Sequence, residues 1–190
     1  AVYQRLDDNE RALFYHTEAA GLFMETRDER GLAQAYMNLG NTLCFLDRFA
    51  ESEEMYAKCE SAASRLGMQE LLVQSRYNKA YLYFLSGRLS EAVAQYRDAR
   101  PLFQDSGSLR HAALCDLDEA EIYVQLCLPQ DALVLAERAA DSFSKLGMPY
   151  ERGKAIAFGA VALTQKRRFG DALSAFSSAA VFISDSWKKT

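Results

Sequence analysis

The sequence predicts an all-α protein built as a solenoid of antiparallel helix pairs, with about nine helices. Three observations predict this fold class. The 190 residues include only 10 Gly and 3 Pro, too few for an all-β protein built on tight turns. Apolar residues recur at the three- and four-residue spacing of a helix face. The pattern also repeats at a constant interval, as Gly67, Gly107 and Gly147 show, and such repeats bury their apolar faces against one another.

The 40-residue period divides the chain into one partial and four full repeats. We treat them as a single array with a partial repeat at 1–30 and full repeats at 31–70, 71–110, 111–150 and 151–190. Within the second full repeat, Ser86–Arg88 interrupts the helical pattern, because Gly87 favours the left-handed conformation that closes a helix. The pattern resumes at Glu91 and stops again near Gly107. Each full repeat is therefore expected to hold two antiparallel helices and two short loops.

The second helix of each repeat has its own start signals. Acidic residues occupy positions 51, 91, 131 and 171, where they complement the positive end of a helix. Pro129 stands near the start of its helix, where a missing N–H costs little. Pro101 falls inside a predicted helix, but Phe103 still fits the core column. We therefore predict that this helix continues and kinks around residues 97–101.

Composition excludes several classes of protein. The net charge of −4 disfavours a broad nucleic-acid surface. No apolar run approaches the roughly 20 residues of a membrane span, and no signal peptide is visible. Cys44, Cys59, Cys115 and Cys127 form no C-x-x-C pair. This pattern favours reduced thiols in a cytoplasmic protein without metal or cofactor, with a disulfide or metal site as the alternative.

The repeated columns resemble the tetratricopeptide repeat, in a 40-residue form of the family. That family has a large–x2–Leu-Gly–x2–Tyr first helix and an Ala–x3–Phe second helix. The matching residues are Tyr36, Leu39, Gly40, Leu43, Ser52 and Tyr56, then Ala80, Tyr83, Ala92, Tyr96 and Ala99, then Ala120, Tyr123, Ala132, Ala136 and Ala139, then Ala160, Leu163, Ala172, Phe176 and Ala179. The resemblance implies a right-handed superhelix in which the small residues let neighbouring helices approach closely.

Two neighbouring repeats depart from the pattern with opposite charges. Arg76 and Lys79 stand in the columns that Asp116 and Glu119 occupy one repeat later. Our hypothesis is an inter-repeat ion cluster of these four residues. The alternative is four solvated charges on longer helices. Exposed pairs of this kind contribute only about 0–1 kcal/mol each.

No residue constellation predicts catalysis. His16 shares a core column with Tyr56, so we interpret it as a packed or partly buried structural residue. His111 is expected to face solvent, and its helical i, i+4 spacing to Cys115 permits contact, but Cys115 stands in a column of small packing residues. The carboxylates of Asp116 with Glu119, and of Asp118 with Glu121, fit an ion-paired or solvated helix face better than acid–base catalysis. The predicted protein is therefore not an enzyme.

The family resemblance implies a concave channel lined by the first helices. Counted from residues 33, 73, 113 and 153, as the family's motif aligns here, its positions are the second, fifth, ninth, twelfth and thirteenth of each repeat, and their side chains are mostly apolar and aromatic. The candidate partner-binding residues are Met37, Asn41, Phe45, Tyr77, Tyr81, Phe84, Leu117, Glu121 and Val124. Such a lining suits an apolar peptide or a partner helix. The alternative is that longer helices close the channel and these residues pack against each other.

The function predicted is a non-catalytic protein- or peptide-binding scaffold or regulatory module. The rival is a cytosolic sensor that binds a small signalling peptide or effector and changes conformation. Relatives that hold acidic chaperone tails use a clamp of Lys, Arg and Asn. Asn41 and Asn78 match its Asn positions, but Met37 or Tyr77 stands at its first Lys position. Leu114 and Asp118 replace its later basic residues, so that function is disfavoured. Self-association through uncapped array ends is plausible.

A second resemblance concerns the parent protein. The segments Ala113–Leu117, Glu121–Tyr123 and Leu146–Glu151, with Ala139 and Phe143, are similar to bacterial repeat regions that precede a caspase-like peptidase domain of the CHAT type. The partner implied is then another domain of the same chain. We expect the sequence to be a window cut from a longer array, with Ala1–Asp8 the remnant of a helix.

Overall fold

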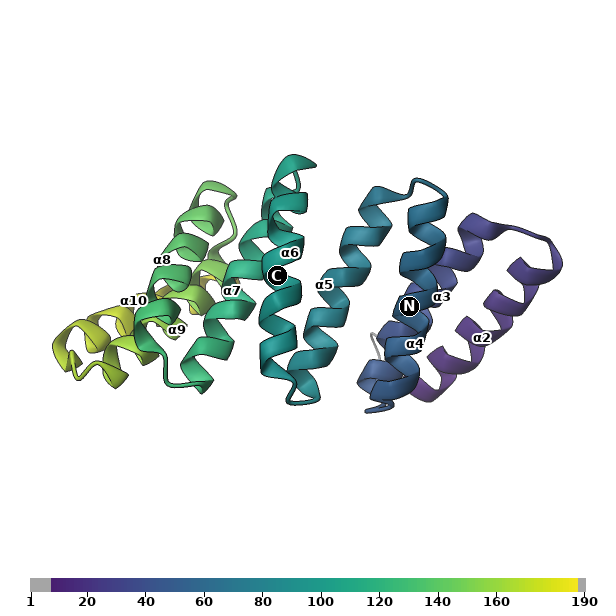
Figure 1. Ribbon diagram of the computed structural model, residues 1–190. Helices are drawn as coiled ribbons and strands as arrows, with labels where there is room; N and C mark the ends of the chain where they lie inside the picture. Colours follow the sequence, from purple (N-terminus) through teal and green to yellow (C-terminus); the bar gives the residue numbers. More distant parts are fainter. Residues whose placement is uncertain (1–7, 188–190) are drawn as a thin grey trace. The chain divides into compact units, whose positions relative to one another are not determined.

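The computed structural model describes residues 8–187, with side chains to residue 184. Over the described residues the chain forms nine α-helices and no strand, as predicted, and Figure 1 shows them alternating in direction. The helices are α2 (Asn9–Glu25), α3 (Glu29–Phe45), α4 (Phe49–Arg65), α5 (Gln69–Leu85), α6 (Leu89–Asp105), α7 (Leu109–Gln125), α8 (Pro129–Lys145), α9 (Pro149–Gln165) and α10 (Phe169–Trp187). Residues 1–7 of the predicted helix remnant lie outside the described range.

The 40-residue period has a simple structural origin. Helices such as α3 and α4 have 17 residues each, and three-residue loops join them, so a helix pair with its two loops spans one period. In the loop after α3, the Arg48 N–H donates to the Leu43 carbonyl (2.9 Å) and the Asp47 N–H to the Cys44 carbonyl (3.1 Å). This pattern is the Schellman motif, which requires a left-handed residue in the middle of the loop.

That left-handed position is glycine in only half of the described loops. Gly67, Gly87, Gly107 and Gly147 have positive φ, and so do Arg27, Asp47, Cys127 and Arg167. A side chain with a Cβ is strained in this conformation. The glycine column was visible in the sequence, but the four other loops lack this marker and still close in the same way.

Replacing Cys127 by glycine is therefore expected to stabilise the protein by about 1 kcal/mol, because its φ of 55° no longer strains a Cβ. The midpoint of thermal unfolding should rise by about 2–4 °C. Cys127→Ala is the control, since it removes the thiol and keeps the Cβ. An equal rise in both variants would show that the thiol, not the backbone, limits stability.

The helices divide into two compact units, Ala1–Gln95 and Tyr96–Thr190, which we describe separately. In unit 1, α3 packs on α4 with its backbone close to the ring of Tyr56. A Cβ at Gly40 would lie 2.7 Å from that ring, and the Ser52 hydroxyl donates to the Gly40 carbonyl at 2.7 Å. The close approach that the small-residue column predicts is therefore confirmed at Gly40.

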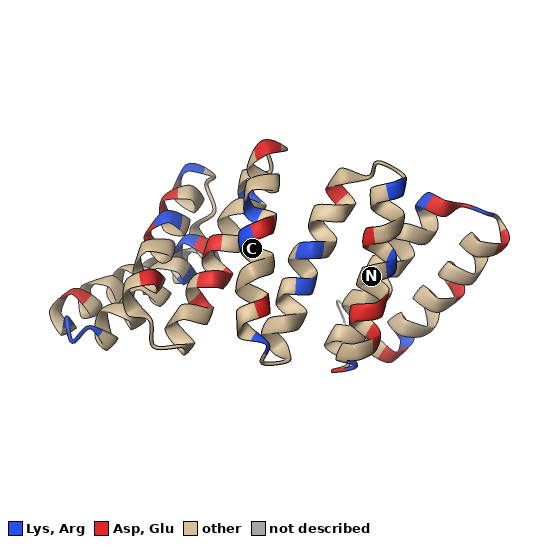
Figure 2. Cartoon of the chain, viewed as in Figure 1, with Lys and Arg blue, Asp and Glu red and all other residues tan. Residues whose placement is uncertain are grey.

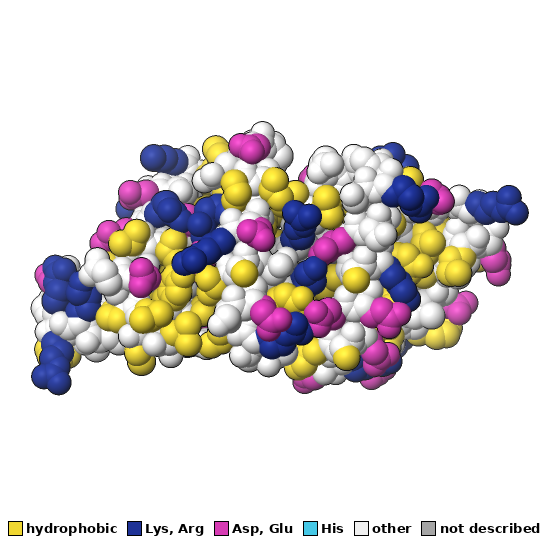
Figure 3. Space-filling model, viewed as in Figure 1, with side chains coloured by type: hydrophobic (Ala, Val, Ile, Leu, Met, Phe, Trp, Pro, Cys, Tyr) yellow, Lys and Arg dark blue, Asp and Glu magenta, His cyan; other side chains and the backbone are white. Residues whose placement is uncertain are grey.

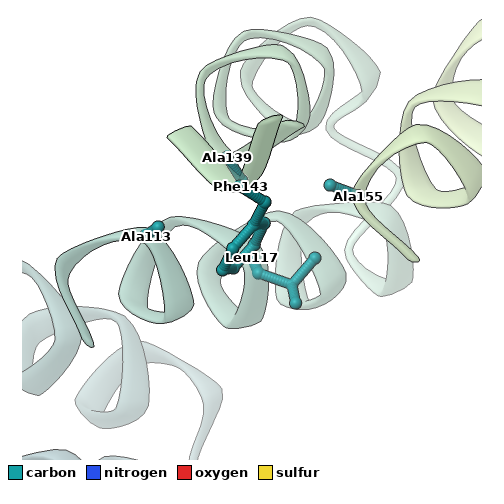
Figure 4. Packing of buried hydrophobic residues seen from close by; sticks show 5 residues of the cluster. All are labelled: Ala113, Leu117, Ala139, Phe143 and Ala155. Carbon is teal, nitrogen blue, oxygen red and sulfur yellow. The ribbon is translucent and has the colours of Figure 1, made fainter. Parts of the chain in front are cut away.

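In unit 2, the ring of Phe143 fills the space between small residues. It is fully buried with Leu117 among Ala113, Ala139 and Ala155 (Figure 4). The cluster joins α7, α8 and α9, so each helix pair depends on its neighbour for a complete core.

Two further predictions concern the helices themselves. Helix α6 runs through Pro101 to Asp105, so the predicted continuation is confirmed, while the kink stays a prediction. Helix α10 exposes Phe169, Leu173 and Val181. Self-association through this end of the array also stays a prediction.

Candidate functional site

The first helices of unit 1 carry most of the predicted channel residues. We call this surface the α3–α5 face. It consists of Gln34, Met37, Asn41, Cys44 and Phe45 on α3 and Gln74, Tyr77, Tyr81, Phe84 and Leu85 on α5. On each helix these positions recur at spacings of three, four, three and one, so they share one helical face. Helices α3 and α5 contact each other, which brings the two sets together.

The outer part of the α3–α5 face is apolar and exposed. Phe45 and Tyr81 are 56% and 38% exposed, and Leu85 is also exposed. The rings of Tyr81 and Phe84 lie 6.1 Å apart with a tilt of 33°. Met37 is buried, so it supports this surface and cannot contact a partner without rearrangement. Sequence columns place Met37 correctly on the face but do not reveal its depth.

Asn41 fixes the α3–α5 face to the rest of unit 1. Its side-chain carbonyl accepts a hydrogen bond from the Tyr56 hydroxyl (2.8 Å) and another from the Asn78 amide (2.9 Å). Burial raises the pKa of Tyr56, which keeps its hydroxyl protonated and available as the donor. Asn41 thus links α3 with α4 and α5.

A polar hollow marks the amino-terminal end of the α3–α5 face. It has a volume of about 380 Å³. Its lining is Arg30, Gln34, Met68, Gln69, Glu70, Leu71 and Gln74. Gln34 and Gln74 belong to the predicted channel columns, whereas Arg30 and Gln69 were not predicted. They come from the first turns of α3 and α5, which the column rule does not include.

The remaining three candidates lie in unit 2. Leu117 is only 1% exposed and packs in the Phe143 cluster, so its assignment as a contact residue is corrected to a core residue. Glu121 and Val124 are half-buried. Burial raises the pKa of Glu121, and the nearby charge of Lys154 opposes that shift.

The residues considered for catalysis are held in structural contacts. His111 does not face solvent as predicted; it is half-buried and stacks on Phe103 with ring centroids 5.0 Å apart. Its Nδ1 atom lies 2.8 Å from the Ser108 hydroxyl. Cys115 is fully buried, and burial raises the pKa of its thiol, so a reactive thiolate is disfavoured. His16 is half-buried, as predicted.

Cysteine and metal chemistry is limited in the described part of the chain. Cys44, Cys59 and Cys115 are buried free thiols, and Cys127 is an exposed one. Among the described residues, no three His, Cys, Asp or Glu side chains gather in a way that would hold a metal ion. No described helix combines the length and the apolar character that crossing a membrane requires.

Asp116 and Glu119 form an ion cluster, but its basic residues are arginines of α6 and α8, so the predicted pairing with Arg76 and Lys79 was wrong. Asp116 and Glu119 are 4% and 1% exposed, and Arg100 pairs with both of them. Arg138 binds Asp116 through two hydrogen bonds (2.5 and 2.7 Å), and Arg97 binds Glu119 at 2.7 Å. In Figure 2 the acidic positions of α7 lie beside basic positions of α6 and α8. We call this group the α7 ion cluster.

The pairing of Lys79 was also predicted wrongly. Its ammonium group binds Glu60 at 2.7 Å, and both side chains are largely buried. The reason is geometric: a first helix packs against second helices, as α7 does on α8, so its charges meet Arg or Glu residues there. The alternative of four solvated charges is wrong for Asp116 and Glu119, because both are buried.

The described fold and surface define a class of helical-repeat protein whose units pair two antiparallel helices. The tetratricopeptide repeat family model matches residues 31–105, so this part of the chain carries tetratricopeptide repeats. No curated protein sequence matches the chain significantly.

Three solved structures show how widely this fold is shared. BtubC (BKLC) from P. vanneervenii is 19% identical with a TM-score of 0.84, covering 96% of this chain and 76% of that one. The repeats of a putative kinesin light chain from Podosopora anserina are 15% identical with a TM-score of 0.77, covering 98% and 92%. A Rap protein, solved with Competence and Sporulation Factor, is 15% identical with a TM-score of 0.76, covering 99% and 61%. At these identities the likeness concerns the fold.

Proposed function

We propose that this chain is a non-catalytic scaffold or regulatory module and that its α3–α5 face binds an apolar peptide segment of a partner protein. One observation carries the proposal. None of the ten residues of the face is charged, although 25% of the whole chain is Asp, Glu, Lys or Arg. Elsewhere the surface carries both negative and positive side chains. Figure 3 shows acidic and basic residues interspersed over the side of the molecule in view.

The physical chemistry of the α3–α5 face supports this role. Aromatic side chains that remain exposed beside one another gain free energy when a partner removes them from water. Tyr and Phe are enriched at the centres of protein interfaces, where charged residues are depleted. The polar hollow at one end of the face offers amide groups of Gln34 and Gln74 to the polar backbone of an extended peptide. A partner on another domain of the parent protein meets the same requirements.

The test begins with peptides selected from a displayed random library on the whole chain. We expect apolar, weakly charged sequences to be enriched. Truncating Phe45 and Tyr81 together to alanine should weaken their binding at least about tenfold in a calorimetric titration, because truncated aromatic anchors cost about 1.4 kcal/mol or more.

The chain provides a matched control for that variant. Phe14 and Tyr15 on α2 are 59% and 50% exposed, and their rings form an edge-to-face pair 5.3 Å apart. They equal Phe45 and Tyr81 in residue type and are at least as exposed, but lie outside the face. Phe14→Ala/Tyr15→Ala should leave affinity within about twofold. Equal losses in both double variants, or no loss in either, would reject the α3–α5 face as the binding surface.

A further inference from the structure

The second helix of each repeat meets the first helix of the following repeat. At each of these junctions the same two repeat positions recur, at a constant spacing along the chain. We call these the seam pairs. They are Ala20 with Leu39, Glu60 with Lys79, Arg100 with Glu119, and Ala140 with Gly159. Each pair lies within one compact unit. The members of a pair can therefore be compared directly for size and charge.

Three of the four seams are filled. Ala20 and Leu39 belong to one buried apolar cluster, a small residue against a large one. Glu60 and Lys79 form an ion pair at 2.7 Å, and Arg100 pairs with Glu119. In each case the second residue compensates the first in volume or in charge.

The fourth seam is not filled, because Ala140 and Gly159 are both small. Ala175 adds to the deficit, since the buried Leu135 stands at this position one repeat earlier. A pocket of about 130 Å³, open to solvent on one side, remains between α8, α9 and α10. We call it the seam pocket; its lining is Leu133, Ala136, Glu137, Ala140, Ala155, Ile156, Gly159, Leu163 and Ala175.

The atoms around Gly159 leave room for a side chain. A Cβ added there would lie 3.6 Å from the Cβ of Ala136 and 3.7 Å from a methyl group of Leu133, which are ordinary contacts. At Gly40, by contrast, the same atom would meet a ring at 2.7 Å. The first glycine leaves room for a group of several atoms, whereas the second is required by close packing.

The chemistry of the seam pocket selects its ligand. Eight of its nine residues are apolar or glycine, and Glu137 is exposed, so a water molecule in the pocket finds few polar partners on its walls and is displaced favourably by an apolar group. Binding sites for small molecules are concave and mostly apolar, and a volume of ~150 Å³ is enough to hold a benzene molecule. We propose that the seam pocket binds an uncharged hydrocarbon group about the size of a benzene ring or a leucine side chain. This site lies in unit 2 and is independent of the α3–α5 face.

The test uses toluene as the probe and the whole chain as the protein. We expect saturable toluene binding in ligand-observed NMR and a higher unfolding midpoint in its presence. Gly159→Leu should weaken toluene binding at least tenfold, because the new side chain occupies the pocket. Gly21→Ala is the control, since Gly21 has open space around it, and it should bind toluene like the unchanged chain. Failure of the unchanged chain to bind, or equal binding by Gly159→Leu, overturns the proposal.

Gly159→Leu recreates the pair of a small and a large residue in the first seam, so the variant should fold. Its thermal unfolding midpoint should lie about 2–4 °C above that of the unchanged chain. If it does not fold, Ala140→Leu closes the pocket from α8 and serves the same comparison. A parallel titration with N-acetyl-leucine amide distinguishes the source of the group. Binding of this amide in addition to toluene, with both lost in the filled variant, identifies a polypeptide side chain as the occupant, and binding of toluene alone identifies a small molecule.

Discussion

Replacing Glu119 by alanine is expected to destabilise unit 2 by about 3–5 kcal/mol, because the change removes one of the two buried carboxylates that balance Arg97, Arg100 and Arg138. Arg100 is the critical partner, since its side chain is only 16% exposed and it also holds Asp116. Arg97 would lose its bond to Glu119 as well, although it reaches solvent. Urea unfolding followed by circular dichroism measures the loss.

Glu91→Ala is the matched control for Glu119→Ala. Its carboxylate pairs with Arg88 at 2.6 Å, but both side chains are well exposed, so the unfolding midpoint should hardly change. The double variant Arg100→Ala/Glu119→Leu reproduces the apolar pair of the first seam. Its loss of stability should be smaller than the summed losses of Arg100→Ala and Glu119→Leu measured singly, since neither member of the pair is left as a buried charge without the other. Simple additivity would show that the two residues do not act as a pair.

Truncating Phe143 to alanine is the second large effect, with an expected loss of about 3–5 kcal/mol. The ring is fully buried, and three of the four other buried residues of its cluster are alanines, whose short side chains cannot fill the space that truncation leaves. Phe176→Ala is the control, because Phe176 is partly exposed on α10, and it should cost well under about 1 kcal/mol. The comparison is made by urea unfolding at equal protein concentration. Similar losses for both variants would contradict the packing seen at α7, α8 and α9.

Most of the fold can be predicted from the repeated columns of the sequence. The 40-residue period and the breaks near Gly67, Gly107 and Gly147 are enough to place nearly every helix to within a turn. The three-residue loops after α7 and α9 were harder, because Cys127 and Arg167 adopt the left-handed conformation without being glycine. Pro101 did not end its helix, since the core column at Phe103 outweighs the local cost.

The candidate site was predicted less completely. The channel positions implied by the family resemblance include Phe45, Tyr81 and Phe84, but they contain no information about depth, so Leu117 was assigned to the surface although it lies in the core. The partners of Asp116 and Glu119 were missed because they lie on the second helices α6 and α8, and not in the matching column of the previous repeat. Comparing columns within one helix type cannot find such pairs.

A partner segment is expected to lie on the α3–α5 face, and photo-crosslinking tests this most directly. A selected peptide carrying a benzophenone group is bound to the unchanged chain and irradiated, and mass spectrometry locates the modified residues. We expect the modified residues to belong to α3 and α5, beside Phe45, Tyr81 and Leu85, with none at Phe14 or Tyr15. Crosslinks confined to α2 or to the second helix α4 would contradict the claim.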